Sequence, residues 1–292
     1  MDVLRPFEAC NLCGSQERQR IARLKGDEKY LELCKRCSLF FLNVEELEKA
    51  ADSCQEREVA VEASPFFQES LTHFFEDFFQ RRRLRPGKVL DIGCGTGLFL
   101  VLAREKGWDV QGIEISRRAA ETARSQYGLP VLDEGIEKAF FPDESFDLIT
   151  FWNSLDYMAD PQGALKRAHR FLKRGGLVLV RVTNIRFHLW IYRLWFLRDP
   201  ERGIERCPAV FHVYNFSETT LKRMLEQGGF KQIRVRNSVL TPGDPYQDPS
   251  RTLGKRIGLM KGVVGTASSL LFYGTFGRFC FGSSLVAQGL KE

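Results

Sequence analysis

"VLDIGCGTGLFL", residues 89–100, joins one apolar run to another through a loop that contains three glycines. The first run has the composition of a buried strand, and the second begins a helix. Gly93, Gly95 and Gly97 allow the backbone to turn sharply and to approach a ligand closely, with the amides of the helix start facing it. The spacing is GxGxG, which differs from the GxGxxG of dinucleotide-binding loops. The stretch therefore predicts a strand, a ligand-binding loop and a helix.

Strand patterns and helix patterns alternate from Lys88 towards the C-terminus. The expected strands are 89–92, 110–115, 146–152, 175–182, 231–237 and 283–290, and the expected helices are 98–106, 117–127, 161–172 and one that begins at Ser217. Ser217 is a suitable cap, and Glu218 lies in the first turn of that last helix. The alternation predicts an α/β fold with a mostly parallel sheet covered by helices on both faces.

Two acidic residues accompany the glycine loop. Asp91 precedes the loop on its strand, and Glu114 ends the second strand in "GIEIS". A carboxylate in that second place can accept hydrogen bonds from both hydroxyls of a ribose, which tells against a 2′-phosphate. The pair favours an adenosyl ligand over the alternative, a purely structural glycine turn in some other α/β protein.

Four motifs together resemble those of the class I S-adenosylmethionine-dependent methyltransferases. They are "VLDIGCGTG", "GIEIS", "FPDESFDLITFW" and "LKRAHRFLKRGGLVLVRV", and the resemblance covers roughly residues 66–239 and the final strand. It implies a doubly wound, mostly parallel, seven-stranded Rossmann-like sheet. It also implies an enzyme that uses S-adenosyl-L-methionine as methyl donor.

The resemblance also implies roles for individual residues. The three glycines would surround the methionine part of the cofactor, and Asp91 would orient their loop. Glu114 would hold the ribose, the backbone of Gly135 and Ile136 would meet the adenine with Glu137 near, and Asn153 would lie beside the methionine end. The implied cofactor-binding residues are Asp91, Gly93, Gly95, Gly97, Glu114, Gly135, Ile136 and Asn153.

Two CxxC pairs, Cys10 with Cys13 and Cys34 with Cys37, lie near the N-terminus and are separated by 20 residues. This spacing is typical of a closed structural zinc site, in which four thiolates leave no position for a bound water. The alternatives are chance cysteines or a redox pair, but no βαβ pattern accompanies them. We therefore expect residues 1–43 to form a small zinc-ribbon-like module whose folding depends on the metal.

Composition sets limits on the rest of the chain. The 292 residues are 43% hydrophobic and 27% charged, with a net charge of +6. This balance excludes a wholly disordered or membrane-embedded protein and is compatible with anionic partners. Without a signal peptide or an apolar run of about 18 residues, we expect a cytoplasmic protein. We expect a connector at 44–64 and one methyltransferase domain at 65–292 that begins with a Phe-rich helix.

A zinc-binding N-terminus joined to such a domain is similar to bacterial methyltransferases that act on sugars and cell-surface glycans. "PAVFHVYNFSETTLKRMLEQGGF" resembles their H-x-Y-x-F-S segment. The chain departs from many relatives after the fourth strand, where they carry Glu-His and this sequence has Asp156 and Tyr157. The departure puts in doubt any catalytic role of that histidine here.

Methyl transfer requires alignment of donor and acceptor and, for a weakly acidic acceptor, removal of a proton. His212 is the first candidate for the general base, because the pKa of histidine lies near neutrality and this loop follows the fifth strand. Tyr214 and Asp156 are candidates for groups that bind the acceptor or that act as the base in place of His212. The alternative for His212 is a histidine whose hydrogen bonds serve packing.

Two insertions leave the carboxyl ends of strands, at 184–216 and 239–282, so both are expected on the ligand side of the sheet. Aromatic and apolar residues fill them. They would form a lid over the site, or residues 255–282 would contact the inner membrane surface as a peripheral segment. We expect the zinc module to form a third wall around the acceptor, opposite the insertions.

The sequence therefore predicts a methyltransferase that acts on a small, sugar-containing, glycan-linked or lipid-linked acceptor. One alternative is a ribosomal RNA methyltransferase with an N-terminal zinc site. Against it, the aromatic residues lie in apolar runs rather than among lysines and arginines, so a nucleic-acid partner is disfavoured. Another alternative is a relative that binds the cofactor without catalysis.

Overall fold

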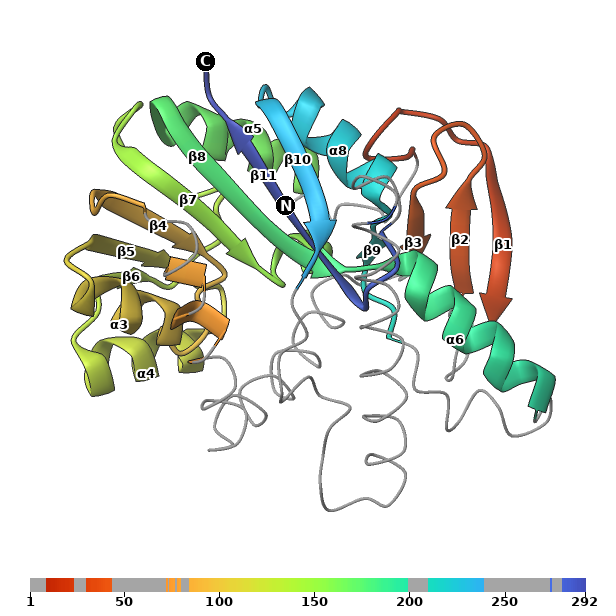
Figure 1. The fold of residues 1–292 in the computed structure, drawn as a ribbon, viewed down its shortest axis with the longest axis horizontal. Coiled ribbons are helices and arrows are strands. Elements are labelled where there is room, and N and C mark those ends of the chain that lie inside the picture. Colours follow the sequence, from red (N-terminus) through yellow and green to blue (C-terminus); the bar gives the residue numbers. More distant parts are fainter. Residues whose placement is uncertain are drawn as a thin grey trace.

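The computed structural model describes residues 9–23, 30–43, 72, 74–76, 78–79, 84–198, 210–238, 274 and 280–292, except for the side chains of 195–198. In these ranges the chain forms a seven-stranded sheet, a four-stranded sheet and flanking helices (Figure 1). The strands are β1 (Arg18–Arg23), β2 (Tyr30–Cys34), β3 (Phe40–Leu42), β4 (Lys88–Ile92), β5 (Asp109–Ile113), β6 (Val131–Leu132), β7 (Phe146–Trp152), β8 (Leu172–Thr183), β9 (Tyr214–Asn215), β10 (Lys231–Asn237) and β11 (Ser284–Leu290). The helices are α3 (Leu98–Glu105), α4 (Arg117–Tyr127), the 3-10 turn η1 (Leu155–Tyr157), α5 (Pro161–Phe171), α6 (Ile185–Arg198) and α8 (Glu218–Gln227).

The larger sheet has the strand order β10-β11-β8-β7-β4-β5-β6. Strand β4 pairs in parallel with β5 and β7, and β8 pairs in parallel with β7, whereas β11 runs antiparallel to both β8 and β10. The predicted doubly wound, mostly parallel seven-stranded α/β fold is confirmed. Because β4, β5, β7 and β8 point the same way, their carboxyl ends meet at one edge, where the candidate site residues gather.

Most predicted elements match the observed ones within a few residues. Strand β6 escaped the sequence analysis because a strand of two residues carries no periodicity. Strand β8 begins at Leu172, before its predicted start at 175, because Leu172 already pairs with Phe146 directly after α5 ends. Ser217 caps α8 as predicted, although the reciprocal partner in its capping box is Thr220.

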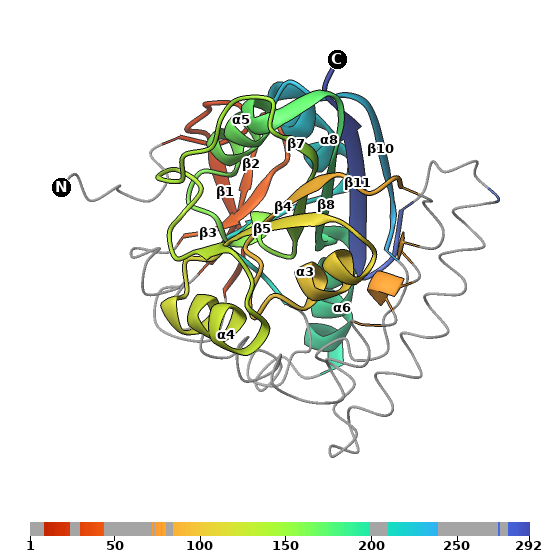
Figure 2. The ribbon, with the colours of Figure 1, turned by 90° about the vertical axis from the view of Figure 1, so that its left-hand side faces the viewer.

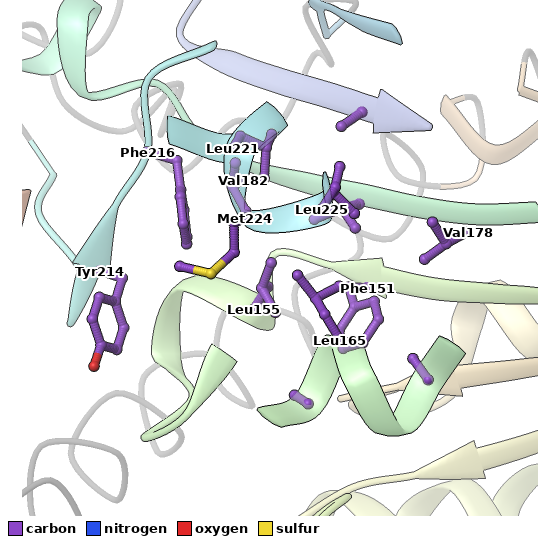
Figure 3. Packing of buried hydrophobic residues seen from close by; sticks show 14 of the residues in the cluster. Phe151, Leu155, Leu165, Val178, Val182, Tyr214, Phe216, Leu221, Met224 and Leu225 are labelled. Atoms are coloured by element: carbon purple, nitrogen blue, oxygen red, sulfur yellow. The ribbon is translucent and has the colours of Figure 1, made fainter. Parts of the chain in front are cut away.

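Side chains of β7 alternate between two cores, one on each face of the sheet. Ile149 and Phe151 pack with residues of α5 and α8, whereas Leu148 and Trp152 pack with residues of α3 and α4. Figures 1 and 2 both show α5 beside α8 and apart from α3 and α4. Figure 3 shows part of the first core, where Leu165 of α5 lies among residues of β7, β8 and α8.

The Phe-rich segment before β4 supplies core side chains, as its spacing predicts. Of its described residues, Phe75, Phe78 and Phe79 are buried against Phe99 of α3 and Trp152 of β7. Phe79 stacks on Phe99 with ring centroids 5.6 Å apart, and Phe75 meets Trp152 edge-on at 5.2 Å. The segment therefore covers the face of the sheet beside the glycine loop.

The four-stranded sheet has the order β1-β2-β3-β9, so the N-terminal module is completed by a strand from the first insertion. Phe40 and Phe41 of β3 pair with Asn215 and Tyr214 of β9. Leu39 and Phe41 of the module also belong to the same buried cluster as the core between β7 and α8. The module thus lies beside the first insertion, and the expectation that it stands opposite that insertion is wrong.

Several predictions fall outside the described residues. They concern the connector 44–64, the bounds between the predicted domains, and the greater part of 239–282, including the segment 255–282 proposed to contact a membrane. Among the helices in the described part of the chain, none combines the length and the apolar character that a membrane crossing requires.

Candidate active site

The glycine loop after β4 has the left-handed backbone that its composition predicts. Gly93, Gly95 and Gly97 have φ values of +76°, +54° and +89°. A Cβ on Gly93 would lie 2.4 Å from Cβ of Ser154, and a Cβ on Gly97 would lie 2.3 Å from Cδ1 of Leu129. Two of the three glycines are therefore also required by close packing of the loop against its surroundings.

Glu114 lies between the glycine loop and the start of α4. Its carboxylate accepts hydrogen bonds from the backbone amides of Gly95 and Ser116, each at 2.8 Å, and only 7% of the residue is exposed. Burial raises the pKa of Glu114, while these two amides act against that shift. The group predicted to hold a ribose is thus held beside the glycine loop.

Asp91 lies beneath the same loop rather than at its surface. The residue is buried, and its carboxylate accepts a 2.7 Å hydrogen bond from the hydroxyl of Thr150 on β7. This contact fixes the end of β4 against β7. The placement is compatible with the implied role of Asp91, which is to orient the loop.

The loop after β6 contains the residues that are predicted to meet the adenine of the cofactor. The backbone of Gly135 passes so close to the carboxylate of Glu137 that a Cβ would lie 2.1 Å from its Oε1. Ile136 is buried, and its carbonyl accepts a 2.7 Å hydrogen bond from Nε of Arg167 on α5. The same guanidinium donates from Nη2 to the carbonyl of Ala139 at 2.6 Å. Arg167 thus holds a loop that sequence reasoning assigned to the cofactor without naming what supports it.

Ile115 is a second residue that sequence reasoning missed. It directly follows Glu114, and 59% of it is exposed although it is a large apolar residue. An exposed aliphatic side chain beside a carboxylate that is predicted to hold a ribose offers a surface for a flat base. The signal in the sequence was weak, because an isoleucine after a strand is most simply read as a core residue.

Asn153 follows β7 and has a φ of +55°, which is uncommon for a residue other than glycine. Its side-chain oxygen accepts a 2.6 Å hydrogen bond from Nη1 of Arg181 at the end of β8. Arg181 also donates to Ser238 at 3.1 Å and lies over the ring of Phe74 at 5.4 Å. The predicted cofactor residue is therefore oriented by an arginine that the sequence analysis did not select.

His212 and Asp156 come together although 56 positions separate them in the sequence. Nε2 of His212 lies 3.8 Å from Oδ2 of Asp156, and the two side chains are 10% and 0% exposed. The ring of Tyr157 stands against the imidazole, with centroids 4.4 Å apart. Burial lowers the pKa of His212, and the carboxylate of Asp156 partly opposes that shift, so the imidazole is neutral at pH 7.

Asp156 carries an unsatisfied atom. Its Oδ2 accepts from the backbone amide and the hydroxyl of Thr183, each at 3.3 Å, whereas its Oδ1 is buried without a hydrogen-bond partner among the described residues. A buried carboxylate oxygen without a partner costs free energy and calls for an explanation. Asp156 also stands two residues after Ser154, whose hydroxyl donates to the carbonyl of Ile92 at the glycine loop. The pair with His212 therefore adjoins the predicted cofactor site.

Tyr214 does not reach this site as a free phenol. It is buried in the core between the module and α5, and its hydroxyl donates to the carbonyl of Ala159 at 3.3 Å. Burial raises its pKa, so the phenolate is disfavoured. Figure 3 shows its ring pointing away from the helix α8 residues of the cluster. This placement argues for packing and against the predicted use of Tyr214 as an acceptor group or base.

The four N-terminal cysteines converge on one point. Their Sγ atoms lie within 4.8 Å of one another, with 3.5 Å between Cys10 and Cys37 and 3.5 Å between Cys13 and Cys34. Four thiolates at about 2.3 Å from a tetrahedral zinc stand roughly 3.8 Å apart, so the donor set fits that metal. No disulfide joins any of the described cysteines, and a hydrogen bond from Cys37 lowers the pKa of Cys10 to about 5, which favours a thiolate.

Each CxxC pair forms its own turn. In the first, the amides of Cys13 and Gly14 donate to the carbonyl of Cys10, and in the second the amide of Ser38 donates to the carbonyl of Cys34. Gly14 and Ser38 both follow the last cysteine of their turn and have φ values of +69° and +63°. The two turns are thus built alike, as expected for the paired loops of a zinc ribbon.

The second turn borders a cavity of about 370 Å³ that it shares with α6 and the start of α8. Phe40 of β3, Ile185 and Leu189 of α6 and Thr219 of α8 line it. Apart from Cys37, none of the predicted site residues borders this cavity. The module and the first insertion therefore enclose a common space.

The strand order and the glycine loop with its acidic partners define a class I, Rossmann-like cofactor-binding domain. A comparison with protein families matches residues 66–235 to the methyltransferase domain family, and the chain belongs to that family. The prediction of an S-adenosylmethionine-dependent methyltransferase is thereby confirmed at the level of the family. The zinc module and the resemblance to glycan methyltransferases are not decided by this match.

Curated relatives give the same class of protein. The ubiquinone biosynthesis O-methyltransferase of Idiomarina loihiensis is 29% identical over 163 residues, which make up 53% of this chain and 66% of that protein. This chain covers only 48% of the length of a protein of the same name from Pseudomonas aeruginosa. The chain thus spans from about half to about two thirds of the length of these named relatives.

Solved structures share the fold. A methyltransferase from Thermotoga maritima superposes with a TM-score of 0.51 at 24% identity. The superposition covers 84% of this chain and 98% of the Thermotoga chain. The plantazolicin methyltransferase BpumL, solved in complex with SAH, has a TM-score of 0.52 at 13% identity, with 84% of this chain and 92% of that chain covered. Similarity at this level of identity shows the fold alone.

Proposed function

We propose that this chain transfers the methyl group of S-adenosyl-L-methionine to a hydroxyl of a small-molecule acceptor, with His212 as general base. The observation that carries the proposal is the buried pair of His212 and Asp156 next to the glycine loop, with 3.8 Å between Nε2 and Oδ2. A neutral imidazole beside a buried carboxylate can accept the proton of a reacting hydroxyl.

The chain's own residues divide the work as follows. Asp156 faces Nε2 of His212 and so favours the tautomer with the proton on that nitrogen, which leaves Nδ1 to accept a proton. The acceptor hydroxyl would pass its proton to Nδ1 of His212 as its oxygen takes the methyl group that bound S-adenosyl-L-methionine would supply, with S-adenosylhomocysteine as the other product. The Asp156 carboxylate stabilises the imidazolium that results.

The cofactor, when bound, supplies an electrophilic methyl group. Glu114 has the geometry to accept from its ribose hydroxyls, and Ile115 offers an apolar surface for its adenine. The left-handed glycine loop provides close backbone approach, and Asn153, fixed by Arg181, lies at the carboxyl end of β7. These placements support the assignments of the sequence analysis.

We propose a sugar-containing or lipid-linked metabolite as the acceptor class. The H-x-Y-x-F-S segment around His212, the net charge of +6 and the aromatic residues of α6 support it. The name of the curated relatives specifies an oxygen acceptor, which supports a hydroxyl. For a lipid-linked acceptor, residues 255–282 are the segment proposed to contact the membrane surface.

We further propose that the four cysteines bind a structural zinc ion. The convergence of four sulfurs and the two similar turns support this assignment. Metal analysis of protein purified without added metal should give one zinc per chain. A double Cys10→Ser and Cys13→Ser variant should contain none, and an unchanged zinc content in that variant would refute the site.

The function is tested with methyl-labelled cofactor. The protein is incubated with the labelled cofactor and host extract, which is then separated into lipid, glycan, small-molecule and RNA fractions. We expect label in the small-molecule, glycan or lipid fraction. The Glu114→Ala variant should bind S-adenosylhomocysteine about 10-fold to 100-fold more weakly, and the His212→Gln variant should bind it normally but label little. Label confined to RNA would favour the ribosomal RNA alternative, and absence of cofactor binding would exclude methyl transfer.

A further inference from the structure

We propose that the N-terminal cysteine module is part of the catalytic apparatus, because it fixes the two loops that bring His212 and Asp156 together. Asn215 is the positioning residue that connects the module to the loop of His212. The inference rests on the proposed role of His212. It goes beyond a structural zinc site, since it assigns the metal-dependent module a specific effect on the acceptor side of the active site.

The first constraint acts on the loop that carries His212. Strand β3 of the module pairs with β9, and the amide of Leu42 donates to the carbonyl of Val213 at 2.9 Å. Strand β9 has only two residues in the described chain, so β3 is what gives it a strand neighbour in the smaller sheet. An isolated extended pair of residues has little stability of its own. The conformation of this loop therefore depends on the module.

Asn215 links that strand to His212. It is fully buried, and its side-chain oxygen accepts a 2.9 Å hydrogen bond from the amide of His212. Its side-chain nitrogen donates to the carbonyl of His212 at 2.7 Å. Its backbone is paired with Phe40 of the module. One side chain thus holds both backbone groups of His212 while its own backbone is held by β3.

The second constraint acts on the loop that carries Asp156. Asn11, in the first cysteine turn, donates to the carboxylate of Asp160 at 2.8 Å and accepts from the amide of Gln162 at 3.0 Å. Asp160 caps α5 through the amide of Gly163, so the cysteine turn binds the start of that helix. Asp156 lies four residues before Asp160, on the same connection. Both members of the pair are therefore tied to the module from opposite sides.

Hydrogen bonds of the cofactor loop join it to other parts of the larger sheet. They run from Gly95 to Glu114, from Gly93 to Ile113 and from Ser154 to Ile92. Loss of the metal should therefore disturb the spacing of His212 and Asp156 before it disturbs cofactor binding. The effect expected is a change in the environment of His212 at nearly constant cofactor affinity.

The test uses full-length protein labelled with ¹⁵N-histidine. The chain has four histidines, and the ring signals of His212 are identified by their loss in His212→Gln. The groups that face this imidazole are the carboxylate of Asp156 and the ring of Tyr157. In the zinc-loaded protein the ring signals of His212 should titrate with a pKa below the ordinary value of histidine. After chelation, or in Asn215→Ala, this pKa should move closer to the ordinary value. S-adenosylhomocysteine affinity should stay within about twofold, because its predicted contacts are elsewhere.

Controls separate positioning from general damage. Lys35→Ala alters an exposed residue in the second cysteine turn and should change neither the signals nor the affinity. If chelation unfolds the chain, zinc-loaded Asn215→Ala and Asn11→Ala decide the question.

Each result has one meaning. Unmoved His212 signals in Asn215→Ala and Asn11→Ala would overturn the inference, as would a loss of cofactor affinity equal to the loss of turnover. A His212→Gln variant with full turnover would instead remove the proposed base, and the spectral effect of the module would still be measured independently. A drop in turnover of 10-fold or more in Asn215→Ala, with cofactor affinity retained, supports positioning.

Discussion

At the scale of single residues, the site depends on groups whose environment differs from water. His212 is neutral because burial lowers its pKa, and Asp156 keeps a buried oxygen without a partner in the described structure. Glu114 has a raised pKa because it is buried, and binding of a ribose that donates to its charged form should lower that pKa. These shifts give predictions with a definite sign.

The first prediction concerns the pH dependence of turnover. The proposed base His212 can accept a proton only when it is neutral, so turnover should fall as pH drops through its lowered pKa, below the ordinary 6.5. Asp156 raises the pKa of His212, so Asp156→Asn should move this acid limb to still lower pH and reduce turnover about 100-fold. Rates measured from pH 4.5 to 8 with labelled cofactor check both statements. An acid limb that moves upward in Asp156→Asn would contradict the assignment.

The same histidine affects stability in one direction. Because its pKa is lower in the folded than in the unfolded state, the unfolded chain binds more protons below pH 6.5, and stability should decrease as pH falls through that window. His212→Gln should remove this part of the decrease in urea unfolding measured across the same pH range.

The second prediction concerns Gly97. Its φ of +89° and the 2.3 Å approach of a Cβ to Leu129 should make Gly97→Ala unfold more easily by about 2–4 kcal/mol. Gly175→Ala is the matched control, since Gly175 has a φ of +75° and nothing within 4 Å of its Cβ position. The control should lose only about 1–2 kcal/mol in urea unfolding. Equal losses in the two variants would show that the close packing is unimportant.

At the scale of elements, loops are held by side chains from neighbouring helices. Arg167 of α5 binds the carbonyls of Ile136 and Ala139 and so supports the loop after β6. Contacts from a turn and from a strand act similarly, since Asn11 of the first cysteine turn supports the start of α5 and strand β3 supports β9. Such contacts join segments far apart in the sequence, and none of them follows a local pattern.

The third prediction concerns this arginine. Arg167→Met keeps most of the aliphatic part of the side chain but removes both donors. The carbonyls of Ile136 and Ala139 then lose their hydrogen bonds to a charged group, each of which contributes about 1.5–3 kcal/mol. We expect S-adenosylhomocysteine to bind about 10-fold more weakly, as measured by calorimetry. Arg118→Met, on the exposed side of α4, is the control and should bind normally. Normal binding by Arg167→Met would show that this loop does not meet the cofactor.

At the scale of the whole molecule, the cysteine module and the methyltransferase fold share one core. Leu39 and Phe41 of the module lie in the same buried cluster as Phe216 and Met224. A module with its own core would unfold separately, whereas a shared core predicts cooperative unfolding.

The fourth prediction follows from this shared core. Removal of zinc should lower Tm by roughly 5–10 °C in a single calorimetric transition, because metal bound only to the folded state stabilises the whole cooperative unit. In the Cys10→Ser and Cys13→Ser double variant the chelator should have no further effect. A separate low-temperature transition upon chelation would contradict the shared core.

Much of the fold was determined by the sequence itself. The glycine loop, the alternation of strand and helix patterns, and the acidic residues at two strand ends predict a class I methyltransferase sheet, because these signals are local and depend on backbone geometry. Spacing alone likewise predicted that four cysteines would converge. Ile115 gave only a weak signal, and Arg167 and Arg181 left none, since the groups that these two arginines contact are distant in the sequence.

Only the tertiary structure decided how these parts meet. The sequence offered His212 as the first candidate for the base, with Tyr214 and Asp156 after it, and the fold places His212 against Asp156 while it buries Tyr214 in the core. It also places the module beside the first insertion through the β3–β9 pairing. The physical reason is that strand pairing and burial join segments with no common periodicity, so local patterns define the elements and long-range packing defines the site.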